Sequence, residues 1–259
     1  VFFPQPDKLV SLADDTLALI SSNSYAGGAL ESIVGKFSWC FLCSRLAFSV
    51  FNRVYADIQR GDGAISKEAR EELWTAVGLA PLLYASWGGI LPNIVVSSDA
   101  SEFGLGVTAA HLSDPRVAMN FWERWRVFPA QERFDVQTEL IPGATWRTII
   151  ASRVKRKARI EALEAHAALL GLKWFVSRKH RASTAVLLID STVVVGALSK
   201  GRTSAFHVLV VVRKIAAIAI GLGLRLIAVW IPSELNSADH PSRHPVVSVD
   251  EAGGEGLRA

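Results

Sequence analysis

The fold is decided by residues 94–110, Ile-Val-Val-Ser-Ser-Asp-Ala-Ser-Glu-Phe-Gly-Leu-Gly-Val-Thr-Ala-Ala. An apolar, β-branched run leads into Asp99, a turn containing Phe103 and Gly104 follows, and a second apolar run continues to Ala110. This pattern predicts a β-hairpin whose first strand ends at a carboxylate. An Asp at a strand end can cap the turn, or it can bind a metal ion. Three more acids downstream, each beside an apolar element, favour the second interpretation.

Each of the three later acids lies next to an element with a clear pattern. Glu164 lies near the apolar stripe of a helix predicted for residues 160–174. Asp190 ends the continuous apolar run 184–189, which is typical of a strand covered on both faces. Asp239 follows the next predicted strand, in a loop or at the start of a helix.

The order of the elements predicts an α/β fold. A hairpin is followed by a helix, a strand, two helices and a further strand, which predicts a mixed β-sheet covered by helices. Because sites in such sheets form at strand ends, the four acids are expected to converge there. Converging carboxylates repel one another unless cations neutralise them, and oxygen ligands select Mg²⁺ or Mn²⁺. Two such ions would support hydrolysis of a phosphodiester.

The first 90 residues predict a separate helical segment. Residues 7–20 and 29–59 carry apolar residues with helical spacing, and Ser66 is expected to cap a third helix. Prolines and glycines between residues 81 and 92 mark a boundary. The predicted division is a helical segment at 1–90, an α/β domain at 91–245 and a flexible tail at 246–259.

Composition narrows the class of protein. Half of the 259 residues are hydrophobic, so the chain can bury a large core. Lys and Arg total 28 against 24 Asp and Glu, a mild basic excess that is compatible with an anionic partner. There are two cysteines and no signal pattern, which predicts an intracellular protein without a disulfide framework. The most apolar stretch, 205–231, contains three basic residues, so no membrane span is expected.

The two cysteines form a Cys-x-x-Cys pair, Cys40 and Cys43. A zinc site would need two more ligands nearby, and a redox pair would need a strand-helix context of the thioredoxin kind. Neither is visible in the sequence around them. We therefore expect two buried helical thiols that pack as small hydrophobic groups.

Four motifs, taken together and in order, resemble a known family. They are Ser98-Asp-Ala-Ser101 followed by Gly104-x-Gly106, Leu163-Glu-Ala-His-Ala167, Ile189-Asp190 before a helix, and Asn236-Ser-Ala-Asp239-x-x-Ser-Arg243. They resemble the ribonuclease H domain of retroelements, over residues 91–245. The ending from Trp230 to Arg243 is most similar to that of DIRS-type retrotransposons. Residues 32–39 resemble, more faintly, the thumb and connection that follow a reverse transcriptase palm.

The resemblance implies a ribonuclease H-like fold and hydrolysis of the RNA strand of RNA–DNA hybrids with two Mg²⁺ (or Mn²⁺) ions. It also implies a polymerase palm and fingers upstream in a parent polyprotein. The chain begins with Val and its one methionine is Met119, which fits a piece of a longer protein. The predicted site residues are Asp99, Glu164, Asp190 and Asp239 for catalysis and metal binding, and Ser101, Lys200, Arg202 and Arg243 for nucleic-acid binding.

Three departures from the family bear on activity. The long interval between Asp99 and Glu164 predicts an insertion, Ser191 stands where relatives often have Asn, and Trp230 stands where many have His. Two alternatives therefore stay open. One is a decayed domain of the same fold that only binds nucleic acid or braces a polymerase. The other is an integrase or resolvase that acts on DNA, against which the Asn-x-Ala-Asp-x-x-Ser-Arg ending argues.

Overall fold

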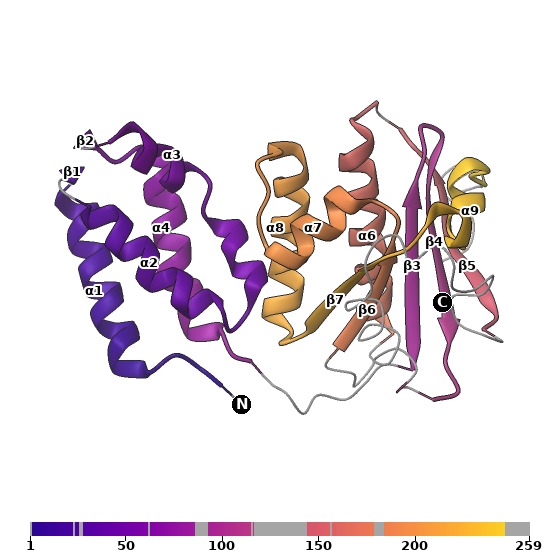
Figure 1. Ribbon diagram of the computed structural model, residues 1–259, viewed down its shortest axis with the longest axis horizontal. Coiled ribbons are helices and arrows are strands. Elements are labelled where there is room, and N and C mark those ends of the chain that lie inside the picture. The colour runs from indigo at the N-terminus through magenta and orange to yellow at the C-terminus, as the bar shows by residue number, and fades with distance from the viewer. Residues whose placement is uncertain are drawn as a thin grey trace, which may run out of the picture. The chain divides into compact units, whose positions relative to one another are not determined.

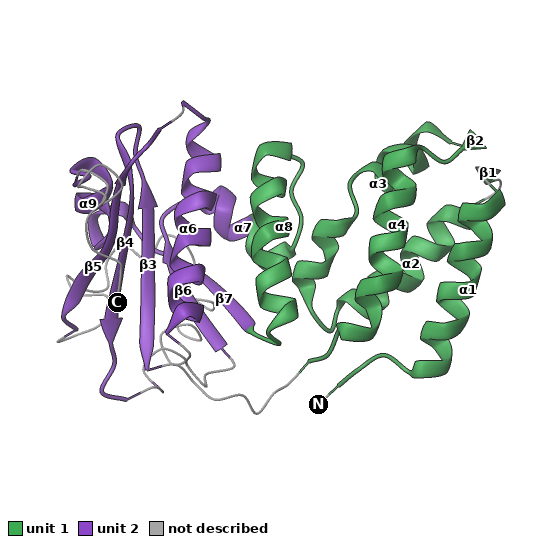
Figure 2. Cartoon of the chain, turned by 180° about the vertical axis from the view of Figure 1, so that it is seen from behind, with its two compact units in different colours: residues 1–89, 197–224 green, residues 90–196, 225–259 purple. Residues whose placement is uncertain are grey.

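The computed structural model describes residues 2–22, 24–25, 28–61, 63–85, 93–114, 116, 144–155, 157–178 and 184–246. The chain forms two compact units (Figure 2). The first, which we call the helical unit, comprises residues 1–89 and 197–224. The second, which we call the sheet unit, comprises residues 90–196 and 225–259.

The division into units is not sequential along the chain. The chain passes from one unit to the other after residue 89, inside α7 (Thr192–Lys200) and after residue 224. The predicted ranges 1–90 and 91–245 contain only the first of these crossings. The pattern of residues 204–221 predicts a helix but does not indicate which core that helix joins. Whether either predicted domain folds alone stays a prediction.

The sheet unit is built on a mixed sheet of five strands in the described residues (Figure 1). The strand order is β5-β4-β3-β6-β7, in which β4 is antiparallel to β3 and β5, and β6 is parallel to β3 and β7. The strands are β3 (Ile94–Ala100), β4 (Gly104–His111), β5 (Trp146–Arg153), β6 (Thr184–Ile189) and β7 (Arg225–Trp230). The predicted fold class, an α/β mixed sheet covered by helices, is confirmed.

The opening hairpin forms as the sequence predicts. β3 pairs with β4 so that Asp99 lies opposite Gly106, and every residue of β3 is buried. β6 is buried throughout as well, as its continuous apolar run predicts. The last pair in the parallel register of β3 and β6 is Ser98 with Ile189. The residues that follow, Asp99 and Asp190, therefore lie at the carboxyl ends of two neighbouring strands.

Helices cover both faces of this sheet. α6 (Ile160–Ser177) packs on β3, β4 and β6, where Gly171 faces Val96. α9 (Asp239–Arg243) packs on β3, β4 and β5, and Ser242 contacts Asp99. Alternate residues of a strand point to opposite faces, so Val96 and Asp99, three positions apart, point to different sides of β3. α6 and α9 therefore lie on opposite faces of the sheet (Figure 1).

The helical unit is an assembly of helices around one core. Its α-helices are α1 (Pro6–Ser22), α2 (Ala29–Phe41), α3 (Arg53–Arg60), α4 (Lys67–Leu79) and α8 (Phe206–Gly221); short 3₁₀ segments are η1 (Arg45–Val50) and η2 (Ala80–Leu82), and β1 (Ser24–Tyr25) pairs with β2 (Gly63–Ala64). Phe37, Phe41 and Phe51 contact one another in the core. The predicted cap is confirmed, because the Ser66 hydroxyl accepts the amide of Ala69 at 3.2 Å.

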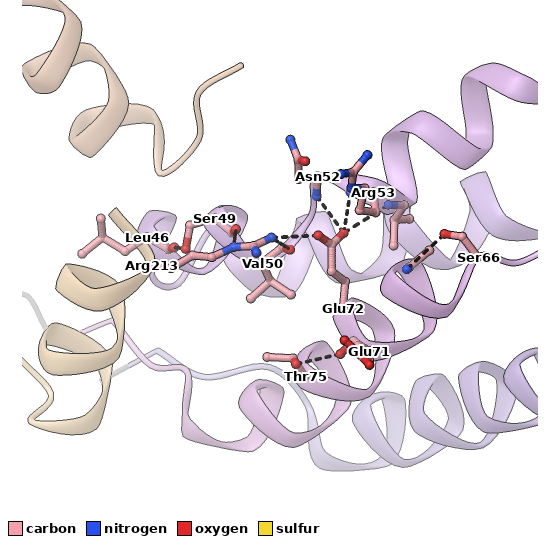
Figure 3. A network of polar contacts seen from close by, with 12 residues as sticks. Leu46, Ser49, Val50, Asn52, Arg53, Ser66, Glu71, Glu72, Thr75 and Arg213 are labelled. Carbon is pink, nitrogen blue, oxygen red and sulfur yellow. Dashed lines mark hydrogen bonds and ion pairs between the residues drawn. The ribbon is translucent and has the colours of Figure 1, made fainter. Parts of the chain in front are cut away.

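The single helical pattern predicted for residues 29–59 is wrong, since α2, η1 and α3 divide it. A buried carboxylate from elsewhere in the chain accounts for the last break. Glu72 Oε2 accepts the amides of Asn52 and Arg53 at 2.8 Å and of Val54 at 3.1 Å (Figure 3). These are the first amides of α3, which lack partners inside the helix. Glu72 therefore caps α3 and allows a new helix to begin there.

The same carboxylate connects α8 to this core. Arg213 Nη2 donates to Glu72 Oε1 at 2.7 Å and to the Val50 carbonyl at 2.7 Å, and Arg213 Nε donates to the Ser49 carbonyl at 2.8 Å (Figure 3). The pair is half-buried on the Arg side and nearly buried on the Glu side. Three separate stretches, η1, α4 and α8, are thus joined by two charged side chains.

Glu72→Ala is expected to lower the free energy of unfolding by about 2 kcal/mol, because it leaves three helix amides and a guanidinium without their acceptor. Urea unfolding of the full chain measures the loss. Glu71→Ala is the matched control, since Glu71 is exposed on the same helix. Equal stability of the two variants would show that the Glu72 contacts contribute nothing.

Cys40 is buried in α2, whereas Cys43 lies beyond the end of that helix and is partly buried, and both thiols are free. Burial raises the pKa of both thiols, and the neighbouring Cys43 raises that of Cys40 further. Protonated thiols are weak metal ligands and weak nucleophiles. In the described part of the chain, no helix is both long enough and apolar enough to cross a membrane.

Candidate active site

Asp99 is the most buried acid at the carboxyl end of the sheet, with 7% of its surface exposed. It lies one residue before the end of β3, and its Oδ2 accepts the hydroxyl of Ser242 at 2.5 Å. The pKa of Asp99 is raised to about 7, chiefly by burial and to a smaller extent by the charges of Asp190 and Asp239, against the lowering effect of the Ser242 hydrogen bond. Asp99 therefore lies within electrostatic reach of two other predicted ligands.

Asp190 follows the last residue of β6 directly and is half-buried. The indole Nε1 of Trp230, at the end of β7, donates to the Asp190 carbonyl at 2.9 Å. The Trp230 side chain thus holds the backbone of a predicted metal ligand. That contact joins the ends of two neighbouring parallel strands.

Glu164 lies in the second turn of α6 and is half-buried. Burial raises the pKa of Glu164, a hydrogen bond from Ser191 lowers it, and the charges of Asp190 and Glu161 raise it. Ser191 is itself nearly buried and accepts the amide of Val194 weakly, at 3.4 Å, at the start of α7. Glu164 therefore joins the group through Asp190.

Asp239 is the first residue of α9, and its position is set by the segment before it. The buried amide of Asn236 accepts the Ser97 hydroxyl at 2.7 Å and the Ala238 amide at 3.0 Å, and it donates to the Ser98 carbonyl at 3.2 Å. These bonds attach the segment directly to β3. The amide of Asp239 also donates to the Asn236 carbonyl at 3.0 Å, so the backbone of Asp239 is attached to the same segment.

Gly104 and Gly106 make room for α9 on β4. A Cβ on Gly106 would lie 2.8 Å from the Ser242 amide nitrogen and closer still to the Ala238 carbonyl. A Cβ on Gly104 would lie 2.9 Å from the Ser242 carbonyl. The Gly-x-Gly spacing puts both glycines on the same face of the strand. The Gly-x-Gly motif therefore has a steric role here.

The predicted nucleic-acid ligands are placed differently from one another. The Ser101 hydroxyl donates to the Ser242 carbonyl at 2.7 Å and accepts the amides of Phe103 and Gly104, so it holds the hairpin turn and α9 together. Arg243 forms an ion pair with Asp239. Lys200 and Arg202 belong to the helical unit, so their proximity to the acids stays a prediction.

The residues that sequence reasoning missed are the neutral partners of the acids. Ser242 and Asn236 lie inside the recognised motif, and their spacing from Asp239 was visible. The sequence does not show that each of them contacts β3. Ser242 bonds to Asp99, 143 residues away, and Asn236 bonds to Ser97, 139 residues away. Trp230 is the third such partner, and its bond to Asp190 depends on the pairing of β6 with β7.

The chemistry of this acid group suits a hard divalent cation, because the side chains supply only oxygen donors and because burial, together with the charges of Asp190 and Asp239, raises the pKa of Asp99. Two of the acids have partners within the protein: Ser242 donates a hydrogen bond to Asp99, and Arg243 forms an ion pair with Asp239. Across the described residues, no three His, Cys, Asp or Glu side chains are grouped closely enough to hold a metal ion. The chemistry of the donor set nevertheless fits such a cation.

Comparisons with known proteins add a likeness to solved structures. No protein-family model matches the chain, and no curated protein matches its sequence. Among solved structures, the chain is similar to the N-terminal RNase H domain of Rv2228c from Mycobacterium tuberculosis, determined as a fusion with maltose-binding protein. The two share 16% sequence identity with a TM-score of 0.37, and the match covers 59% of this chain and 95% of that one. At that level the likeness carries no inference about the activity of this chain.

Proposed function

We propose that the sheet unit is a metal-dependent endonuclease of the ribonuclease H kind, which hydrolyses the RNA strand of RNA–DNA hybrids. The observation that carries this is Asp99, a nearly buried carboxyl group whose pKa is raised to about 7 by burial and by Asp190 and Asp239. Such a group is costly to leave charged unless cations offset it. The four motifs that contain these acids occur in the order found in retroelement ribonuclease H domains.

Each residue has a role in this proposal. Asp99, Glu164, Asp190 and Asp239 would hold two Mg²⁺ or Mn²⁺ ions. Bound there, the ions would supply an activated water and would stabilise the leaving oxygen of the cleaved phosphodiester. The hydrogen bonds from Ser242 to Asp99 and from Trp230 to the Asp190 carbonyl fix the positions of two of these ligands.

We further propose that the basic side chains contact phosphates and do not read bases. A hybrid must be recognised by its backbone and its 2′-hydroxyl groups, because every sequence has to be cut. Lys200, Arg202 and Arg243, with the Ser101 hydroxyl, are the candidates. The parent protein in this proposal is a DIRS-type retroelement polyprotein with a polymerase palm and fingers upstream, and it is intracellular.

A second candidate function is a decayed domain that binds hybrid without cutting it. The ion pair between Arg243 and Asp239 favours this alternative, because the guanidinium occupies a predicted metal ligand. The departures at Ser191 and Trp230 point the same way. The two candidates differ in one measurable property, which is cleavage of a bound hybrid.

The test is incubation of the full chain with an RNA–DNA hybrid labelled on either strand, with Mg²⁺, with Mn²⁺ and with EDTA. We expect metal-dependent fragments of the RNA strand alone, with duplex RNA and duplex DNA left intact. Binding of the hybrid without cleavage would favour the decayed domain. Cleavage of duplex DNA would instead favour an integrase or resolvase. Asp190→Asn is the inactive control.

A further inference from the structure

Asp239 and Arg243, the first and last residues of α9, form a close ion pair. Arg243 Nε lies 2.8 and 2.9 Å from the two carboxylate oxygens of Asp239, and Nη2 lies 2.8 Å from Oδ1. Both oxygens are therefore occupied by one guanidinium. The Arg243 side chain is 61% exposed, and that of Asp239 is 32% exposed. The pair lies where a metal ion and solvent can reach it.

Arg243 also lies within electrostatic reach of two other acids of the group. The pKa of Arg243 is raised mainly by its hydrogen bond to Asp239 and by that charge, and to a smaller extent by Asp99 and Asp190. The guanidinium thus provides positive charge to the acids. α9 itself is attached to the sheet through Asn236 and Ser242. An exchange of partners at Asp239 therefore needs movement of the Arg243 side chain only.

We propose that Arg243 is an internal counter-cation that competes with the divalent ion for Asp239 and becomes free to contact a nucleic-acid phosphate when the ion binds. This inference rests on the proposed function. It reconciles two expectations for the same pair, Asp239 as a metal ligand and Arg243 as a phosphate ligand. Both hold only if the pair opens. Metal binding and hybrid binding are then coupled through one side chain.

The first consequence is measured without any substrate. Mg²⁺ binding is measured as the rise in melting temperature with Mg²⁺ concentration. Because Arg243→Ala removes the competitor, we expect its half-saturating Mg²⁺ concentration to be about twofold to fivefold lower than that of wild type, which is the range of an exposed ion pair. Arg243→Lys should fall between wild type and Arg243→Ala, since an ammonium group cannot pair with both oxygens in the same way. Arg147→Ala is the matched control, because Arg147 is exposed on the edge strand β5 of the same unit.

The second consequence is measured on hybrid affinity in EDTA, where cleavage is absent. Asp239→Asn releases Arg243 without a metal, and it also removes a negative charge that repels phosphates. A double-mutant cycle separates the two effects. The gain in affinity from Asp239→Asn should be about twofold to fivefold larger with Arg243 present than in the Arg243→Ala background. Circular dichroism of each variant checks that the fold is kept.

The outcomes distinguish this inference from the proposed function. Equal half-saturating Mg²⁺ for wild type and Arg243→Ala, or an additive cycle, overturns the inference even if wild type cleaves hybrid. Failure of every variant to bind Mg²⁺ or Mn²⁺ overturns the proposed metal site and this inference together. A lower Mg²⁺ requirement combined with a non-additive cycle supports the inference, whether or not the domain cleaves.

Discussion

Asp99→Asn is expected to abolish cleavage of RNA–DNA hybrids while making the metal-free protein more stable at pH 8. The loss of activity follows from removing a charged ligand whose interaction with the ions contributes several kcal/mol, so the rate should fall about a hundredfold or more. The gain in stability follows from removing a charge that is nearly buried and that faces Asp190 and Asp239. Asn keeps the shape of the side chain and a group that can bond to Ser242.

The effect on stability has a defined pH dependence. Burial and the neighbouring acids raise the pKa of Asp99 to about 7 in the folded protein, whereas the pKa of an Asp in an unfolded chain is about 3.9. The folded state binds the proton more tightly, so this stabilising contribution is complete below about pH 4 and is lost as the pH rises through about 7. Wild type should therefore lose more stability than Asp99→Asn between pH 4 and pH 8, by up to about 4 kcal/mol for a shift of about three pKa units.

Thermal unfolding in EDTA across this pH range measures the difference, and hybrid cleavage in Mg²⁺ is measured in parallel. Glu234→Gln is the control, because Glu234 is an exposed acid of the same unit. Two results would contradict the assignment of Asp99. One is cleavage at the wild-type rate in saturating Mg²⁺, and the other is parallel stability curves for wild type and variant.

Gly106→Ala is expected to remove activity through a different route, by displacing α9. The added Cβ would lie 2.8 Å from the Ser242 amide nitrogen and closer still to the Ala238 carbonyl, and both are backbone atoms that cannot rotate away. α9 must then shift, which moves Asp239 and separates Ser242 from Asp99. Overpacking of this kind costs about 1–3 kcal/mol, and a catalytic group moved by about 1 Å loses about a hundredfold in rate.

Cleavage and urea unfolding are measured on Gly106→Ala beside Gly35→Ala. A Cβ at Gly35, which is exposed in α2, meets no atom within 4 Å, so that substitution should leave cleavage unchanged and should slightly stabilise the helix. Wild-type cleavage by Gly106→Ala would show that α9 does not need this close approach to β4.

The parts of the fold that could be predicted from the sequence are those whose signals are local. The hairpin of residues 94–110 and the buried strand ending at Asp190 follow from apolar patterns of the right length, and the Ser66 cap follows from its place before a helix. The bounds of β5 could not be predicted, because its pattern does not alternate: Arg147 and Thr148 are both exposed, and the next four residues are all half-buried.

Features that depend on contacts between distant residues could not be predicted in this way. The start of α3 is fixed by Glu72, from another helix, and no property of residues 29–59 indicates it. The partners of the candidate acids are distant along the chain as well, since Ser242 and Asp99 are 143 residues apart. The sequence predicts which acids belong together at the strand ends. It does not predict that Arg243 is paired with one of them.

The bond between Arg213 and Glu72 also sets an order of events during synthesis of the chain. The two residues are 141 positions apart, and the sheet unit's β3, β4, α6 and β6 are all made between them. On the ribosome, the first helices emerge long before α8, so the core that they share cannot be completed until most of the sheet has been translated. A nascent chain halted at residue 150 should keep Glu72 without its guanidinium, and its N-terminal helices should be digested by protease faster than those of the finished protein.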